Sequence, residues 1–488
     1  MTDTEVLETK KINTSSTSHF LISMEIAERA LDLALRLGAT YADVRVEELS
    51  REEILIRNGL VESACFEVVR GAGIRVLANT WGFASTTSLT KQAVERAVKF
   101  AVKMAKAAKV RKAIELAPQE PEIAKTKTSL EKDPFKVAMD EKVELCLEAD
   151  RRARVDESIK RTSVSMEAER SQKLFLSTEG TQVESIQVRT YADIFALAKK
   201  RGVTEYYDDI CGGSGGFEII KRFDLVARAK EVGEKAVKLA SARPMPRRSL
   251  PVVLDPDFVS LLVHEIIGHP SEADRVLGKE AAWAGRAWWA GKIGQKVGSS
   301  LVTVVDDPQV EGALGYFDYD DEGVPAKRKY LIQEGILREH MHSRETAAEF
   351  EVEPNGCMRA QSFRFAPLIR MSNTFVEPGD YEVEELFELK RGAYLKGGKI
   401  PSIDSRRYNF QISAKEGYLI EKGELEGPFR NASLVGITPE FLKSIDGVGK
   451  DFEMYPIPNC GKGDPMQTLH VGNGGPHLRG VALVTGAR

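Results

Sequence analysis

The first part of the chain alternates between helix-like and strand-like patterns of apolar and polar residues. Apolar residues recur at helical spacing over residues 24–37, and Gly38 stands where a glycine commonly ends a helix. Residues 41–48 then alternate like a half-buried strand, and the Asn-Gly dipeptide at residues 58–59 indicates a hairpin turn. A long amphipathic helix is predicted over residues 90–109. This order of helix, sheet and helix favours an α+β layer over alternating βαβ units.

Further patterns extend this arrangement to about residue 240. Helices are predicted over residues 136–154 and 225–240, and antiparallel strands between residues 160 and 200. Residues 110–135 have mixed charge and several prolines, which predicts a surface connection. Residues 241–249 (SARPMPRRS) contain two prolines and no periodicity, so we place a domain boundary there.

After residue 250 the pattern changes to short apolar stretches, such as PVVL, LVTVV, YEVEEL and YLI, with frequent Gly and Pro between them. This pattern predicts a β-rich domain that resembles a barrel or a sandwich. The sequence therefore predicts an α+β protein in three parts. These are a polar, flexible tail at 1–19, an N-terminal domain of helices and antiparallel sheet at 20–243, and a β-rich C-terminal domain at 244–488.

Composition narrows the class of protein. Of 488 residues, 42% are hydrophobic and 29% are charged, which is ordinary for a soluble globular protein with sizeable cores. The net charge of −4 argues against broad binding of nucleic acid or of an anionic membrane. The sequence shows neither a secretory signal nor an apolar stretch long enough to span a bilayer. Five widely spaced cysteines without a CxxC pair argue against a disulfide scaffold and a zinc ribbon, so we expect a cytoplasmic protein with reduced thiols.

One predicted helix carries a candidate metal-binding motif. His264, Glu265 and His269 form an HExxxH string. In the familiar HExxH motif the histidines are four residues apart and reach one metal ion from one face of a helix. A spacing of five places them about 140° apart on an ideal helix, so both reach one ion only if the helix bulges or ends between them. Because Gly268 and Pro270 flank His269, we expect the helix to break near Gly268.

A zinc ion would need a third protein ligand, and Cys460 lies in a Gly-rich loop that permits a sharp turn. Taken alone, such a cysteine is more often a buried apolar residue, and the two motif histidines could simply lie at a helix end. His470 and His477 follow closely, and a fourth ligand from either would make the site structural rather than catalytic. His340 and His342 are expected to be solvated at the end of a strand.

In these motifs and their order the chain resembles the TldD/PmbA family of metallopeptidases. The matching stretches are YADVRVE, GAGIRVLAN, GFASTT, HEIIGH, VVDDP, DYDDEGVPAKRKYLIQEGIL, RMSNTFVEPGD and CGKG. The resemblance implies zinc (Zn²⁺) held by His264, His269 and Cys460, with Glu265 as the catalytic carboxylate. All four residues are present, whereas the family's metal-free PmbA (TldE) subunits lack the motif, so the chain resembles a TldD-type member. The GDPMQ stretch after CGK departs from the family's shorter link and leaves the shape of that loop open.

The expected activity is therefore that of a zinc-dependent peptidase. Three protein ligands leave an open position on zinc for water, and Glu265 would take the proton of that water and deliver it to the leaving amine. The β-rich domain could hold an extended substrate as an added strand, which favours small or unfolded polypeptides as substrates. The resemblance also implies a dimer that encloses the site, either a homodimer or a heterodimer with a PmbA/TldE-type subunit. The alternatives are a non-catalytic zinc-stabilised module that binds peptides or proteins, and a modulator subunit.

The sequence leaves the roles of three weaker features open. Residues 212–216 (GGSGG) lack the signature of a phosphate-binding loop, so a bend or a close backbone approach is favoured. Asp320, Asp321 and Glu322 could bind a hard cation but lack the ligand spacing of an EF-hand, so a polar turn is the default. Arg370 could hold a substrate carboxylate or an oxyanion, or form a structural ion pair.

Overall fold

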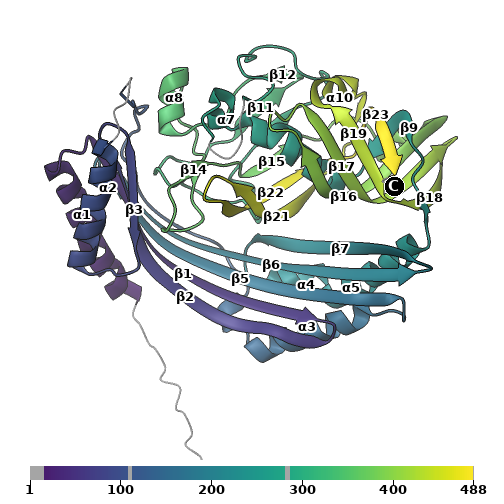
Figure 1. Ribbon diagram of the computed structural model, residues 1–488, viewed down its shortest axis with the longest axis horizontal. Coiled ribbons are helices and arrows are strands. Elements are labelled where there is room, and N and C mark those ends of the chain that lie inside the picture. The colour runs from purple at the N-terminus through teal and green to yellow at the C-terminus, as the bar shows by residue number, and fades with distance from the viewer. Residues whose placement is uncertain (1–15, 108–112, 281–285, 487–488) are drawn as a thin grey trace, which may run out of the picture.

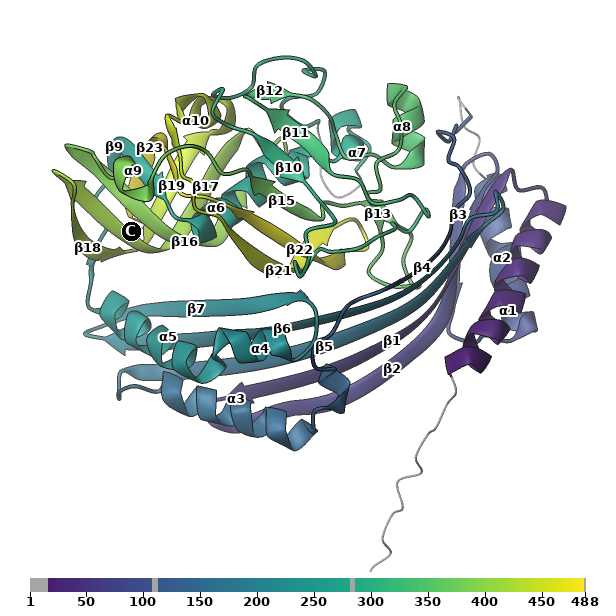
Figure 2. The ribbon, with the colours of Figure 1, turned by 180° about the vertical axis from the view of Figure 1, so that it is seen from behind.

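The computed structural model of the protein describes residues 16–107, 113–280 and 286–486. The chain folds into two parts that face one another (Figure 1). A long curved sheet from the first half of the chain carries helices on its convex side, and a β-rich part from the second half lies on its concave side (Figures 1 and 2). This arrangement confirms the predicted α+β fold class.

The curved sheet is almost entirely antiparallel. Its strands are β1 (Tyr41–Arg57), β2 (Leu60–Leu77), β3 (Trp81–Thr86), β4 (Ile123–Lys127), β5 (Ile159–Ser177), β6 (Gln182–Lys200) and β7 (Val203–Ser214). They are hydrogen-bonded in the order β3-β2-β1-β5-β6-β4, and β7 also pairs with β6. The predicted hairpin is confirmed between β1 and β2, where Asn58 and Gly59 have φ of 50° and 80°. Positive φ at both positions is what this tight turn requires.

The prediction of a plain surface connection over residues 110–135 is wrong for the strand β4, which pairs in parallel with β6. The side chains of β4 are alternately exposed and half-buried, so the strand has no apolar alternation that would have revealed it. Residues 110–112 lie outside the described part of the chain.

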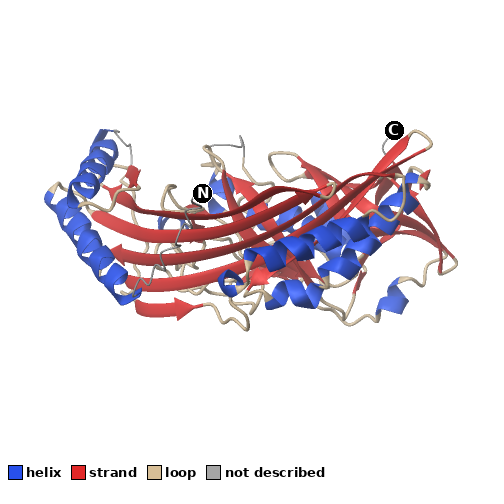
Figure 3. Ribbon diagram, turned by 90° about the horizontal axis from the view of Figure 1, so that it is seen from below, coloured by secondary structure: helices blue, strands red, loops and turns tan. Residues whose placement is uncertain are grey.

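Two groups of helices lie against the sheet, at its opposite ends (Figure 3). They are α1 (Ser16–Arg36), α2 (Lys91–Ala107), α3 (Met139–Ala153), α4 (Glu218–Phe223) and α5 (Leu225–Ala240). The apolar faces of α1 and α2 share one core with the sheet, and those of α3 and α5 share another. The helices predicted from apolar periodicity are confirmed, although α1 begins inside the segment predicted as a tail. None of the described helices combines the length and the apolar character needed to cross a membrane.

The second half of the chain contains a closed barrel, as the β-rich pattern predicts. Strand β16 pairs with β9, β9 with β23, β23 with β19, β19 with β17, and β17 again with β16. The strands of this sheet are β8 (Arg243–Pro244), β9 (Arg248–Leu254), β16 (Arg391–Ile403), β17 (Asn409–Glu421), β18 (Glu424–Arg430), β19 (Ala432–Ile437), β20 (Gly447–Val448) and β23 (Leu478–Gly486). Apolar side chains such as Val252 and Leu434 fill its core.

A second sheet lies beside the barrel, and one edge of it faces the curved sheet (Figures 1 and 2). Its strands are β12 (Ile336–Leu337), β11 (Lys329–Gln333), β10 (Val304–Asp306), β15 (Asn373–Val376), β22 (Gln467–Gly475) and β21 (Glu453–Lys462), in that order. A two-stranded ladder is formed by β13 (Met358–Arg359) and β14 (Leu368–Ile369). The remaining α-helices, all labelled in Figure 2, are α6 (Pro256–Val263), α7 (Ala273–Leu277), α8 (Arg344–Phe350), α9 (Val383–Leu386) and α10 (Thr438–Ser444). The stretch YEVEEL was predicted to be a strand, and this is wrong: α9 lies there, begun by reciprocal hydrogen bonds between Glu382 and Glu385.

Buried ion pairs fasten the two parts together at residues 320–322. The Asp321 carboxylate lies 2.5 Å from Lys173 Nζ on β5, and the Glu322 carboxylate lies 2.9 Å from Arg75 on β2. Asp320 accepts hydrogen bonds from backbone N–H groups, including that of Met358 at 2.9 Å. The acidic turn thus forms an interlock, a set of buried polar contacts that joins the curved sheet to the C-terminal part. This is a structural role for Asp320, Asp321 and Glu322, which the sequence left open.

Candidate metal centre

The helix that carries the two motif histidines changes its winding between them. After α6, residues His264–Gly268 form a wider π-helical turn, in which the N–H of His269 donates to the carbonyl of His264. An i→i+5 bond places His269 one turn beyond His264 and on the same side of the helix. The predicted break near Gly268 is therefore wrong, because the helix widens and continues, which is the other alternative that the five-residue spacing allows.

Gly268 packs closely against Met371. A Cβ atom at residue 268 would lie 2.9 Å from both Sδ and Cε of Met371, so a larger residue there would require the end of that buried side chain to shift. The backbone of Gly268 itself is ordinary helix, with φ −58° and ψ −61°.

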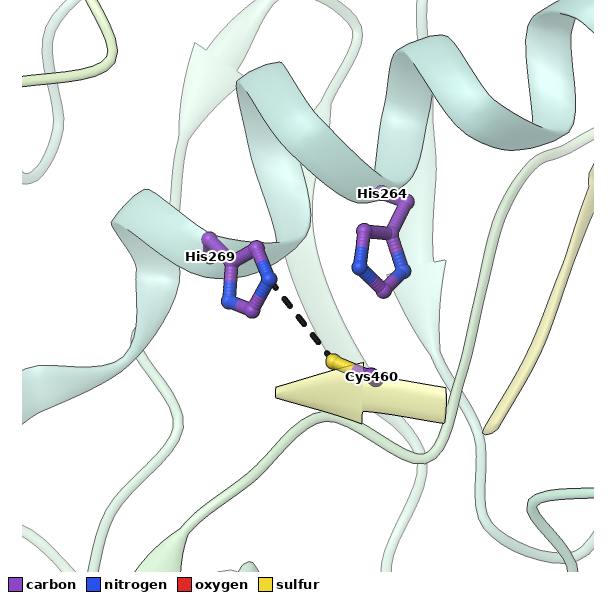
Figure 4. Close-up of side chains that lie close together, drawn as sticks. All are labelled: His264, His269 and Cys460. Atoms are coloured by element: carbon purple, nitrogen blue, oxygen red, sulfur yellow. Dashed lines mark hydrogen bonds between the residues drawn. The ribbon is translucent and has the colours of Figure 1, made fainter. Parts of the chain in front are cut away.

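The structure brings the three predicted metal ligands together (Figure 4). Ligand atoms of His264, His269 and Cys460 all lie within 4.8 Å of one another. The two imidazole rings are 4.7 Å apart, nearly perpendicular, and His269 Nε2 lies 3.7 Å from Cys460 Sγ. Cys460 comes from β21, just after an irregularity in its pairing with β22. All three side chains are almost fully buried.

Each histidine is oriented by a side-chain oxygen of another residue, which lies beside Nδ1 of its imidazole ring. His264 Nδ1 lies 3.0 Å from the Asn473 side-chain oxygen, and His269 Nδ1 lies 3.2 Å from Glu272 Oε2. Such partners hold the Nδ1 proton and leave Nε2 free to bind a metal ion. Neither Asn473 nor Glu272 was found from the sequence, although Glu272 stands only three residues after His269.

Glu272 is itself the centre of a buried charge network. It accepts a hydrogen bond from Arg275 Nε at 2.8 Å, and Lys462 Nζ lies 3.2 Å away. Lys462 also donates to Asp274 at 2.8 Å. Burial opposes ionisation of Glu272, but Lys462 and His269 outweigh it and hold its pKa well below the ordinary value. An ionised carboxylate therefore stands behind His269.

The electrostatics of the three ligands fit a divalent ion. Burial opposes ionisation of the Cys460 thiol, but the charges of His264 and Arg370 outweigh it and hold its pKa well below the ordinary value. Burial also opposes protonation of His264, yet the Cys460 thiolate raises its pKa to about 9. The site thus favours a thiolate together with one compensating positive charge. Two imidazole nitrogens and a thiolate are the donor set of zinc or another borderline-soft divalent ion, so these residues fit a zinc site.

Arg370 braces the strand that carries Cys460. Its guanidinium is fully buried and donates to the carbonyl oxygens of Cys460 and Gln467, the latter at 3.2 Å. A substrate carboxylate cannot reach it there, and its hydrogen bonds within the described residues go to the main chain rather than into the ion pair that the sequence allowed.

Glu265 lies on the wide turn, next to a ligand but outside the ligand group. Its carboxylate forms an ion pair with Arg407, which lies in the connection between β16 and β17. Both side chains are about nine-tenths buried, at 12% and 9% exposed. Arg407 was not found from the sequence, because its contact with Glu265 spans more than 140 residues of chain.

The remaining histidines lie elsewhere. Within the described chain, neither His470 nor His477 belongs to the ligand group, and His477 Nδ1 lies 2.8 Å from Asp451. The prediction that His340 and His342 are solvated is wrong, because both are buried. Burial lowers their pKa values to about 4 and about 3.

Two of the glycines at residues 212–216 meet neighbouring backbone, as the predicted close backbone approach requires. A Cβ atom on Gly213 would lie 2.3 Å from the Gly312 carbonyl oxygen, and one on Gly216 would lie 2.2 Å from that of Lys132. These positions require glycine because another chain segment passes directly over them.

Comparison with known proteins places the whole chain in one group. Models of the PmbA/TldA metallopeptidase family match as domain 1 over residues 42–105, as central domain over 132–243 and as C-terminal domain over 247–483. The chain is 35% identical to metalloprotease MJ0996 of Methanocaldococcus jannaschii, over 95% of this chain and 100% of that protein. It is 31% identical to the zinc metalloprotease TldD homolog of Saccharolobus solfataricus, over 93% and 98%. The crystal structure of TldE from Thermococcus kodakarensis shares the fold, with a TM-score of 0.74 at 20% identity, over 94% of this chain and 99% of that one.

Proposed function

The chain belongs to the PmbA/TldD metallopeptidase family, and from this premise we propose that it is a zinc-dependent peptidase that cleaves small or unfolded polypeptides. One observation carries the proposal: two imidazoles and a thiolate converge in a buried site beside Glu265, while His470 and His477, within the described chain, stay out of the ligand group. A site with three protein ligands keeps a position open for chemistry.

In this proposal His264, His269 and Cys460 hold the zinc ion. When bound, zinc supplies a Lewis acid that polarises the peptide carbonyl and makes water more acidic. The Glu265 carboxylate accepts a proton from the attacking water, whose oxygen forms the new bond to the carbonyl carbon. The C–N bond then breaks, and Glu265 returns the proton to the leaving nitrogen. Arg407 holds the carboxylate in place, and Glu272 and Asn473 keep both imidazoles aimed at the ion.

The proposal also covers the domain boundaries, the partner subunit and the cellular location. The boundaries 20–243 and 244–488 are supported by the family models, which divide near residue 245. We also propose a dimer, either of two copies of this chain or with a PmbA/TldE-type subunit, whose fold this chain shares. We place this activity in the cytoplasm, without a nucleic-acid or membrane partner, in keeping with the net charge of −4.

A non-catalytic zinc module is the second candidate, and the ion pair between Glu265 and Arg407 favours it. A carboxylate that is committed to an arginine is a structural arrangement, whereas a general base must be able to meet water.

The two candidates are separated by the variant Glu265→Gln. Cleavage of an unstructured peptide is followed by mass spectrometry at matched zinc content, with the family partner subunit added in a parallel series. A general base contributes roughly 10²–10⁴-fold to the rate, so the variant should lose at least 100-fold in kcat while it keeps its zinc. Asp257→Asn removes a carboxylate from the first turn of the same helix and serves as the control. Equal activity of wild type and Glu265→Gln would reject the assigned role.

A further inference from the structure

The curved sheet and the strands β21 and β22 face one another (Figure 2), and a cavity between them holds a second group of side chains of the kinds that bind metals. The cavity has a volume of about 550 Å³, and residues of β5, β6 and β22 line it. It is separate from the zinc centre. His470 directly follows Leu469, which pairs with Cys460, and successive side chains of a strand point to opposite faces. His470 therefore projects away from the face that carries Cys460.

The group consists of Glu167, Glu169 and His470. The two glutamates are two residues apart on β5, so they project from the same face of the curved sheet. His470 meets them from β22 on the opposite wall. Ligand atoms of all three residues lie within 4.8 Å of one another, and His470 Nδ1 is 3.9 Å from Glu169 Oε1.

The His470 side chain has no hydrogen-bond partner within the described residues. The residue is only 9% exposed, and the 3.9 Å to Glu169 is too long for a hydrogen bond. The ring contacts Tyr191, which offers it an aromatic face. Burial lowers the pKa of His470 to about 4, so the imidazole is neutral at pH 7 and has a free lone pair. The imidazole lines the cavity, so its nitrogens are open to a ligand there.

Neighbouring side chains hold the two carboxylates from behind. Arg51 Nε lies 2.9 Å from Glu167 Oε1, and Arg51 also donates to Glu169 Oε2 at 3.2 Å. The Tyr191 hydroxyl donates to Glu167 Oε2. Both oxygens of Glu167 are thus paired with donors, whereas Glu169 Oε1 lies 3.9 Å from His470 and equally far from Arg189. Carboxylates of metal sites are themselves commonly hydrogen-bonded to neighbouring groups.

The charge of the cavity favours a cation. Six carboxylate side chains line it, against four lysine and arginine side chains. Burial raises the pKa of Glu167 above its ordinary value, whereas for Glu169 the charges of His470, Arg189 and Arg51 outweigh burial and lower the pKa. An anion would meet a surplus of negative charge, whereas a divalent cation would relieve it.

We propose that Glu167, Glu169 and His470 bind a second divalent transition-metal ion, which links the curved sheet to the C-terminal part of the chain. One imidazole nitrogen and carboxylate oxygens form a harder donor set than the site with Cys460, and they suit Mn²⁺ or Zn²⁺. The ion has no assigned part in peptide cleavage. The ion would cross-link β5 and β22, which belong to two different sheets.

The test uses the full chain and Mn²⁺ as the probe. A double variant, His264→Ala with His269→Ala, removes the first centre, and Mn²⁺ binding is then measured by electron paramagnetic resonance after equilibrium dialysis. We expect one bound equivalent. Adding His470→Gln should weaken this binding at least tenfold, whereas Asp193→Asn, a change of another carboxylate of the same cavity, should leave it unchanged.

Two results would overturn the proposal. One is a folded double variant, checked by circular dichroism, that binds no Mn²⁺ at millimolar concentration. The other is binding that His470→Gln does not alter. If the double variant fails to fold, crystals of the wild type soaked in Mn²⁺ decide the question. An anomalous peak between His470 and the two glutamates supports the proposal, and a map without such a peak refutes it.

Discussion

Replacing Glu272 by glutamine tests whether the residue behind His269 controls zinc binding. Glu272 Oε2 faces His269 Nδ1 at 3.2 Å, Arg275 Nε at 2.8 Å and Lys462 Nζ at 3.2 Å. A glutamine keeps one oxygen that can accept from His269. It removes the negative charge and presents an amide NH₂ group to a surrounding of donors. The imidazole then loses both orientation and basicity.

The size of the effect follows from these contacts. Loss of such a partner typically costs 10–100-fold in metal affinity, which is about 1.4–2.7 kcal/mol. The fold should also lose stability. Breaking a buried ion pair costs about 3–5 kcal/mol, but Lys462 keeps Asp274 and Arg275 keeps Glu280, so we expect a loss of about 2 kcal/mol in the metal-free protein.

Zinc affinity is measured by competition with a chromophoric chelator, and stability by urea unfolding of the metal-free protein. Glu280→Gln is the matched control, because Glu280 lies 3.5 Å from Arg275 but is not a partner of His269. The control should bind zinc like the wild type. If Glu272→Gln folds and its zinc affinity stays within threefold of the wild type, the argument about orientation is refuted.

Three further predictions concern stability and the wide helical turn. Because His340 and His342 have folded pKa values of about 4 and about 3, the stability that each contributes is complete above pH 6.5 and falls as the pH decreases. Below pH 6.5 the free energy of unfolding should fall by about 1.4 kcal/mol per pH unit for each histidine. Urea unfolding between pH 7.5 and 5 should therefore show a smaller pH dependence for His340→Gln than for the wild type. An unchanged pH dependence would contradict this prediction. Asp321→Asn leaves Lys173 without its 2.5 Å partner and should cost about 3 kcal/mol in urea unfolding, so a loss below 0.5 kcal/mol would argue against the interlock. Gly268→Ala should reduce zinc content at equilibrium, and Met371→Ala in the same chain should restore it; failure of this rescue would show that the Met371 contact does not set the turn.

The elements with local signals were predictable from the sequence. The helix α5 coincides with its predicted range, and the hairpin at Asn58 follows from the dipeptide alone. Strand β4 was missed because its pairing with β6, rather than any apolar alternation, makes it a strand. For α9, alternation suggested a strand, but capping at Glu382 produces a helical turn.

The candidate site likewise contains residues that the sequence predicts and residues that it does not. His264, Glu265, His269 and Cys460 were recognisable from motif spacing and family resemblance. The wide turn between the histidines was not, because the five-residue spacing allows either a bulge or a helix end and the sequence does not decide between them. The residues that orient the site could not be predicted from the sequence either, since Asn473 and Arg407 come from distant strands and loops. A motif therefore indicates which atoms bind the metal, while tertiary structure decides how they are held.

The central claim is that a zinc ion on His264, His269 and Cys460 drives peptide hydrolysis. The most direct test is to strip the metal, add back one equivalent of zinc, and measure cleavage of an unstructured peptide by the wild type and by Cys460→Ala, each with the partner subunit present. We expect the metal-free wild type to be inactive, zinc to restore its activity, and Cys460→Ala to stay inactive at the same zinc concentration. Cleavage by the metal-free protein, or full activity of Cys460→Ala, would contradict the claim.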